Sequence, residues 1–141
     1  MPVPQCAPES FHILRAKSLG KYKAFRKGLD QLAAEGVVQI LKNEARGDAS
    51  PVMAAVGPMQ FEVMQARMEF EYNVETATEP IPYSVARRTD AESAPELGRQ
   101  RGVEIFTRQD GELIALFGDK WKLAFIEKEH PELTMETLVA D

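Results

Sequence analysis

The chain has 141 residues, of which 44% are hydrophobic and 28% charged, and its formal net charge is −5. This composition excludes a disordered, low-complexity segment, and the length fits one domain, which we expect to span residues 1–141. The lone cysteine, Cys6, has no disulfide partner, no secretory leader precedes it, and no apolar run reaches the roughly 18 residues of a membrane-spanning helix. The sequence therefore predicts a soluble cytoplasmic protein that does not enter a membrane.

Positive charge is concentrated near the N-terminus. Six basic residues and no acidic residue lie between positions 15 and 27, which leaves 11 of the 17 basic residues against all 22 acidic ones in the rest of the chain. A local basic patch on an acidic chain favours contact with phosphate groups, a signal that the net charge hides. The six residues are Arg15, Lys17, Lys21, Lys23, Arg26 and Lys27.

The first predicted elements are a strand at residues 10–15 and a helix at residues 18–35. Ser18 is the expected N-cap of this helix and Gly36 its stop. Gly28, in the middle of the helix, costs roughly 1 kcal/mol relative to alanine, which indicates close packing at that point. The basic outer face of the helix has two interpretations, a solvated surface or a contact with a phosphate backbone.

A central helix is predicted to start at Pro58, after strands at residues 37–41 and 51–56 and the polar loop at 42–50 between them. Gly57 lets the chain leave the strand sharply, and Pro58 fits a first helical turn. Two opposite faces of this helix are apolar at helical spacing. One face has Phe61, Met64, Met68 and Tyr72; the other has Met59, Val63, Ala66 and Phe70. We expect a sheet to cover the first face, and residues 83–101 or the last helix to cover the second.

A strand at residues 74–78 completes the order strand, helix, strand, strand, helix, strand. That order is typical of an α+β fold, the split βαβ (ferredoxin-like) sandwich, in which both helices lie on one face of an antiparallel sheet. The C-terminal part is predicted to extend it with a hairpin and a helix. Its expected elements are a strand at 83–89, a short helix at 95–100, a hairpin at 103–106 and 113–117, a helix at 120–129 capped by Asp119, and an edge strand at 133–139.

Three motifs identify a family. Residues 57–63 read Gly-x-x-Gln-Phe-Glu-Val, residues 71–75 read Glu-Tyr-x-Val-Glu, and residues 83–87 read Tyr-x-x-Ala-Arg. Together they resemble the C-terminal domain (domain III) of the class II peptide chain release factor, a bacterial translational GTPase. Arg88 stands where that family usually has a tryptophan, and Cys6 where it has an aromatic residue.

The resemblance implies a role in translation termination. In that family the whole factor binds the ribosome and promotes dissociation of the class I release factors. Its GTPase domain, which binds GTP and Mg²⁺, and its barrel domain have no counterpart here, and this chain has no phosphate-binding loop motif. We therefore expect a non-enzymatic module without a cofactor. Its expected partners are the ribosome, the GTPase and barrel domains of the same factor and, indirectly, the class I release factors.

Two groups of basic residues are the predicted ribosome contacts. The main group lies on the first helix and immediately before it, and a weaker group follows residue 86. The main group is Lys17, Lys21, Lys23, Arg26 and Lys27, and the weaker one is Arg87 and Arg88, with Arg99 and Arg101. Packing is the preferred interpretation of Trp121 and Tyr83, with stacking on nucleotide bases as the alternative.

Two rival functions use the same fold, because fold does not decide function. One is an acylphosphatase-like hydrolase, for which Arg46-Gly47-Asp48 would be a poor phosphate-binding loop. The other is a regulatory small-molecule module that dimerises through its sheet edges. Nucleophilic catalysis is not supported, since Cys6, His12 and His130 lack partner motifs.

Overall fold

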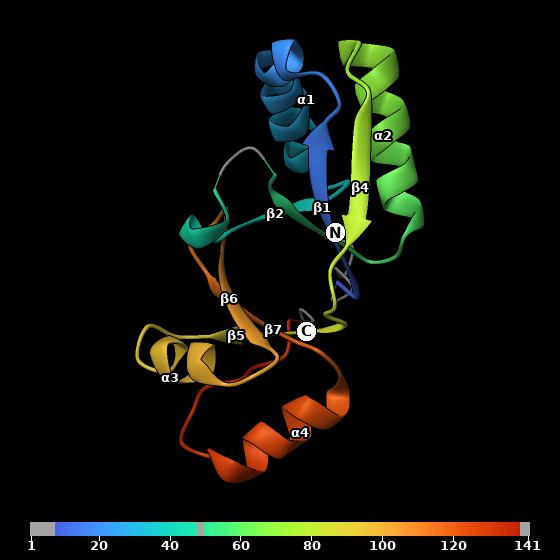
Figure 1. The fold of residues 1–141 in the computed structure, drawn as a ribbon. Helices are drawn as coiled ribbons and strands as arrows, with labels where there is room; N and C mark the ends of the chain where they lie inside the picture. The colour runs from blue at the N-terminus through green and yellow to red at the C-terminus, as the bar shows by residue number, and fades with distance from the viewer. Residues whose placement is uncertain (1–7, 48–49, 139–141) are drawn as a thin grey trace, which may run out of the picture.

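The structure, a computed structural model, describes residues 8–47 and 50–138 (Figure 1). Cys6, Asp48 and the end of the predicted edge strand at 139 lie outside the described residues. The first half contains β1 (Ser10–Ala16), α1 (Tyr22–Ala34), β2 (Gln39–Lys42), β3 (Val52–Ala55), α2 (Met59–Tyr72) and β4 (Thr76–Pro80). The second half contains β5 (Val85–Thr89), α3 (Ala94–Arg99), β6 (Val103–Arg108), β7 (Leu113–Phe117) and α4 (Lys120–Glu129).

The strands form one antiparallel sheet of seven strands in the order β4-β1-β3-β2-β6-β7-β5. The first four follow the order of a split βαβ sandwich, so the predicted α+β ferredoxin-like fold is confirmed. The hairpin β6-β7 joins at β2 through the pairs Leu41–Arg108 and Lys42–Thr107. The second half therefore continues the first sheet instead of forming a separate one.

All four helices pack on the same face of this sheet, at its two ends. Residues that pair directly across antiparallel strands lie on the same face of the sheet. His12 pairs with Met53, and Met53 pairs with Ile40, so these three side chains share the face that α1 and α2 cover. The same face continues to Ile105 and Ala115 under α3 and α4. The helices of the first half contribute Phe25, Leu29, Leu32, Phe61, Met64 and Met68 to its core, and those of the second half contribute Leu97, Leu123 and Ile126.

The opposite face of the sheet closes on itself. One core cluster contains Phe11 of β1 and Ala86 of β5, although four strands separate β1 from β5 in the sheet. The two halves are thus bent toward each other, with α1 and α2 at one end of the molecule and α3 and α4 at the other (Figure 1). The cluster between the halves is Phe11, Leu41, Val52, Ala54, Ile81, Ala86, Phe106, Ile114 and Leu116.

Several predicted boundaries need correction. The helix expected from Ser18 starts with a 3-10 turn at Leu19–Lys21, and α1 begins at Tyr22, because the Ser18 side chain makes no capping hydrogen bond. Strand β4 runs two residues further than expected and includes Pro80, which an edge strand tolerates. The predicted edge strand at 133–139 is reduced to one bridge between Glu136 and Arg88.

The second apolar face of α2 is not covered, so that prediction was wrong. Met59, Val63 and Phe70 are exposed, and Phe70 retains 92% of its accessible surface. Neither segment expected to cover them does so. Helix α4 packs on β7, and residues 83–101 form β5 and α3, all at the other end of the molecule (Figure 1). Only the face of α2 with Phe61, Met64 and Met68 is buried.

The prediction of close packing at Gly28 is confirmed at the crossing of α1 and α2. A Cβ atom at this position would lie 2.7 Å from Met68 Sδ and 2.9 Å from the Tyr72 ring. We expect Gly28→Ala to lower the free energy of unfolding by about 1–3 kcal/mol, because overpacking outweighs the gain of about 1 kcal/mol in helix propensity. Urea denaturation measures this change.

Gly20→Ala is the matched control for this variant, since its added Cβ would approach only Ser18 Oγ, at 3.9 Å. Its stability should stay close to that of the parent chain. A Gly28→Ala variant as stable as the parent would contradict a tight helix crossing.

Candidate nucleic-acid interface

We give the name α1 basic surface to a group of basic residues that lie just before α1 and on its first two turns, namely Lys17, Lys21, Lys23, Arg26 and Lys27. Lys23 and Lys27 are exposed one turn apart. Within residues 8–47 and 50–138, neither of them nor Lys17 or Lys21 forms an ion pair. Four cations therefore face solvent without a neutralising carboxylate in contact.

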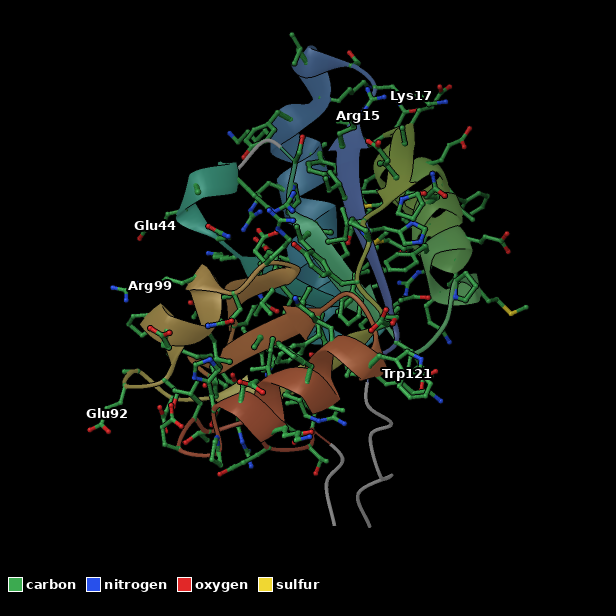
Figure 2. The ribbon with its side chains drawn as sticks, turned by 60° about the horizontal axis from the view of Figure 1, so that its bottom comes forward. Arg15, Lys17, Glu44, Glu92, Arg99 and Trp121 are labelled. Carbon is green, nitrogen blue, oxygen red and sulfur yellow. The ribbon has the colours of Figure 1, made fainter. Side chains whose placement is uncertain are left out.

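The structure places Lys17 and Lys21 slightly apart from the other three. They border a shallow hollow of about 400 Å³ with Ser18, Asn73 and Glu75, at the C-terminal end of α2. The Lys17 backbone N–H donates to the Glu75 carbonyl at 2.9 Å, which fixes the chain leaving β1 against the chain entering β4. Figure 2 labels Lys17 and Arg15 at this end of the molecule.

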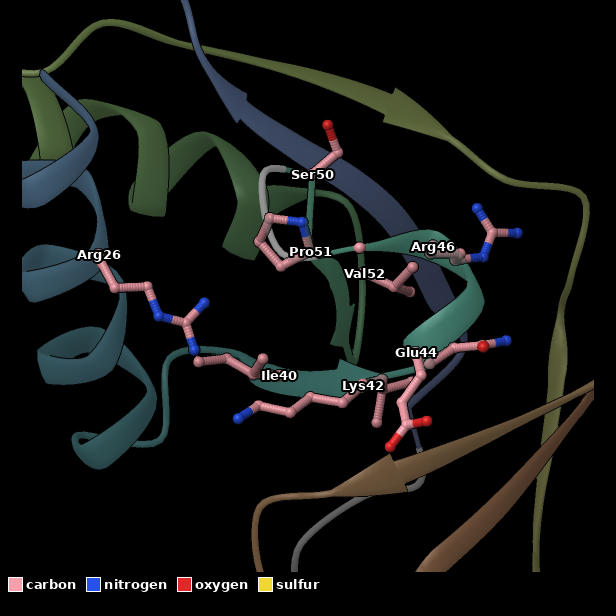
Figure 3. A pocket seen from close by; sticks show the side chains of 11 residues that line it. Arg26, Ile40, Lys42, Glu44, Arg46, Ser50, Pro51 and Val52 are labelled. Atoms are coloured by element: carbon pink, nitrogen blue, oxygen red, sulfur yellow. The ribbon is translucent and has the colours of Figure 1, made fainter. Parts of the chain in front are cut away.

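Arg26 turns toward the sheet instead of the outer face. It lies 3.8 Å from Asp30 and lines a cavity of about 80 Å³ with Lys42 of β2. Figure 3 shows the two side chains extending toward each other from α1 and β2. Lys42 is not among the contacts predicted from the sequence, although the alternation of side chains along the strand indicates where it lies. Lys42 shares with buried Ile40 the face of β2 that α1 covers, so its ammonium group has to emerge beside the helix.

The weaker group of predicted contacts lies elsewhere. Arg87 and Arg88 are on β5, at the end of the sheet opposite β4, and the structure does not bring them near α1 (Figure 1). Arg88 donates to Glu136 at 3.0 Å, and Arg87 donates to the Ala86 carbonyl at 2.8 Å. Arg99 pairs with Glu96 at 3.2 Å. Most of this second group is therefore engaged within the chain.

A polar cluster that the sequence did not predict lies where the two halves meet. Glu104 of β6 accepts hydrogen bonds from Arg46 Nη2 at 2.7 Å, Tyr83 Oη at 2.9 Å and Asn43 Nδ2 at 2.8 Å. Burial alone would raise the pKa of Glu104, but the bonds from Arg46 and Tyr83 hold it below its ordinary value. Burial and the adjacent carboxylate raise the pKa of Tyr83 to about 12.

This cluster shows the roles of Tyr83 and Arg46, which the sequence alone did not decide. Tyr83 is held by Glu104 and packs on the core between the halves, so it is a packing residue, as preferred. Arg46 also lies 5.8 Å from the Phe106 ring centroid. Because Glu104 already holds its guanidinium group, Arg46 is a poor phosphate ligand for a hydrolase.

The described part of the chain has no group of three His, Cys, Asp or Glu side chains arranged to hold a metal ion. None of its helices is long and apolar enough to cross a lipid bilayer.

Comparison with known families decides the assignment. A model of the family described as "Class II release factor RF3, C-terminal domain" matches residues 1–127. The chain belongs to this family. Peptide chain release factor 3 of Synechococcus elongatus is 39% identical over 138 residues, covering 96% of this chain and 25% of that protein. The release factors 3 of Trichodesmium erythraeum and Symbiobacterium thermophilum are 39% and 37% identical, over 94% and 93% of this chain.

This release factor 3 domain spans about a quarter of the length of those relatives. Its motif residues have structural roles. Gln60 Oε1 accepts a hydrogen bond from the Gly57 N–H at 3.1 Å, which ties the first turn of α2 to the residue before Pro58. Phe61 is buried and stacks on His12, with ring centroids 4.1 Å apart. The motifs that identify the family therefore fix the start of α2 and the junction around Tyr83.

Proposed function

We propose that this domain docks the longer release factor onto the ribosome by contacting RNA phosphates with the α1 basic surface. The observation that carries the proposal is that Lys17, Lys21, Lys23 and Lys27 are without an ion pair in the described part of a chain whose net charge is negative. Arg26, together with Lys42, extends the positive surface toward β2. Cations of this kind supply the electrostatic part of RNA binding.

The proposal assigns no chemistry to this chain itself. GTP and Mg²⁺ would be bound by the GTPase domain of the longer protein, and the domain would act in the cytoplasm during translation termination. Its indirect effect would be the dissociation of class I release factors. A hydrolase or a small-molecule regulatory module is not favoured, because the family is that of release factor 3 and Glu104 already holds Arg46.

The exposed face of α2 supports a second part of the proposal, interdomain coupling. Met59, Val63 and Phe70 form an apolar strip on a helix that is buried only on its other side. Apolar strips of this kind mark contact surfaces. The relatives are about four times as long as this chain, so we assign the strip to the GTPase or barrel domain of the same factor.

The docking surface is tested by co-sedimentation of the chain with bacterial 70S ribosomes over a salt series. We expect Lys23→Glu with Lys27→Glu to weaken binding at low salt and to reduce the slope of log K against log salt by roughly 1.4–1.8, since each of the two lost phosphate contacts contributes about 0.7–0.9.

A control with the same total charge change is Arg88→Glu with Arg99→Glu, because both arginines are already paired with carboxylates. This control should retain most of the binding. If the Lys23 and Lys27 variant binds like the parent chain, or if both double variants lose binding equally, the α1 basic surface is not the docking site.

A further inference from the structure

Helix α4 presents an aromatic face to solvent. Trp121 is 75% exposed and Phe125 57% exposed, whereas Leu123 and Ile126 point into the core. At 100° per residue, Trp121, Ala124, Phe125 and Lys128 share the outward face, one or two turns apart. Figure 2 shows Trp121 projecting from the start of the helix. The outward face thus has two large rings, with Glu127 on one flank and Glu129 on the other.

Lysines accompany both rings. Lys120 Nζ lies 5.7 Å from the Trp121 ring centroid, and Lys122 Nζ lies 5.9 Å from the Phe125 ring centroid. The Lys122 side chain passes over Gly102. A Cβ atom added to Gly102 would lie 3.4 Å from Lys122 Cε.

The nearby acids leave these lysines free. The Asp119 side chain caps the helix by accepting a hydrogen bond from the Lys122 backbone N–H at 2.7 Å. At 100° per residue, Glu127 and Glu129 lie on the two flanks of the outward face. Among the residues that the structure describes, Lys120, Lys122 and Lys128 form no ion pair. Residues 119–129 carry three lysines and three acidic residues and so have no net charge, but the two lysines over the rings have no carboxylate at ion-pair distance.

We propose that the outward face of α4 is a stacking platform for unpaired RNA nucleotides. A partner that fits it has to be both planar and anionic, because the rings offer stacking surfaces and the lysines offer counterions. Unpaired nucleotides meet both conditions with bases and phosphates. An apolar protein surface would leave three ammonium groups without partners, and a simple polyanion would leave the rings unused.

The platform extends the proposed function, since it takes RNA as the partner class, but it uses a different surface. The α1 basic surface and α4 lie at opposite ends of the molecule (Figure 1). Two separated contacts would fix the orientation of the domain on RNA, which one basic helix alone would not do.

Trp121 is the only tryptophan in the chain, so its fluorescence reports on this face directly. The experiment titrates the chain with single-stranded octaadenylate at low salt. We expect quenching of Trp121 fluorescence, and we expect Phe125→Ala to weaken binding about 5- to 150-fold, the range of one lost stacking contact. Phe70→Ala is the control, because it removes an exposed ring from α2 and should leave the titration unchanged.

Inorganic polyphosphate and polyglutamate serve as anions without bases. Equal quenching by either one, or equal binding by the Phe125→Ala and Phe70→Ala variants, would overturn the platform. Absence of quenching by octaadenylate would also overturn it. The Lys23 and Lys27 charge-reversed variant should still show quenching, so that failure of the α1 basic surface and failure of the α4 platform are told apart.

Discussion

Replacing Phe61 with alanine is expected to lower the free energy of unfolding by about 3–5 kcal/mol, the usual cost of removing a buried aromatic ring. Phe61 is 2% exposed, packs into the core under α1 and α2, and stacks on His12. Loss of the ring would leave a cavity at the start of α2 and would remove the stacking partner of His12. Urea denaturation followed by far-UV circular dichroism gives the change.

Phe70→Ala is the matched control for this prediction, because it makes the same chemical change on the same helix. Phe70 is almost fully exposed, so its removal should change the stability by less than about 0.5 kcal/mol. Comparable losses in the two variants would mean that both faces of α2 are buried, which would contradict the orientation of the helix described here.

Two helix ends and the buried face of α2 could be predicted because their signals are local. Gly36 ends α1 with a φ of 81°, as a glycine after a helix typically does. The Asp119 side chain caps α4, as expected. In α2 the spacing of Phe61, Met64 and Met68 correctly marked the buried face. Each of these signals involves residues within two or three turns of each other.

The bend of the sheet could not be predicted, because it depends on contacts between distant segments. Strands β2 and β6 are joined by only two residue pairs, and the core between the halves brings Phe11 together with Ala86. An apolar strip indicates that a helix face favours burial, but it does not indicate which element packs on that face. For this reason the sequence offered both α4 and residues 83–101 as cover for the second face of α2, although α4 packs on β7 and that face is exposed.

The candidate interface was predicted in part. The run of cations from residue 15 to 27 is visible in the sequence, and its exposure follows from helix periodicity. Its partners are not visible, since Lys42 comes beside Arg26 and Glu75 beside Lys17 only through the sheet topology. Trp121 was interpreted as a packing residue, and its exposure shows that interpretation to be wrong.

The cluster around Glu104 leads to the second large effect. Glu104→Ala is expected to lower the free energy of unfolding by about 2–4 kcal/mol, because it leaves the half-buried Arg46 guanidinium without its carboxylate. Asn43 and Tyr83 lose their acceptor at the same time. Urea denaturation at neutral pH measures this loss.

Glu136→Ala is the control for an exposed ion pair. It removes the partner of Arg88 at a site where both side chains are open to solvent, so it should cost no more than about 1 kcal/mol. Equal losses in the two variants would contradict the role of Glu104 in holding the two halves together.

The pH dependence of stability tests the same cluster independently. The folded-state pKa of Glu104 lies below its ordinary value of about 4.3, so its contribution is complete above that pH and is lost as the pH falls through the folded-state pKa. Hydrogen bonds also lower the pKa values of other carboxylates, such as Asp90 and Asp110, so they add to the acid dependence of the parent chain. The measurement is therefore the difference between the parent chain and Glu104→Gln, which should shrink below about pH 4.3. A difference that is constant from pH 7 to pH 3 would show that Glu104 has the same pKa in the folded and the unfolded chain, which would contradict a carboxylate stabilised by Arg46 and Tyr83.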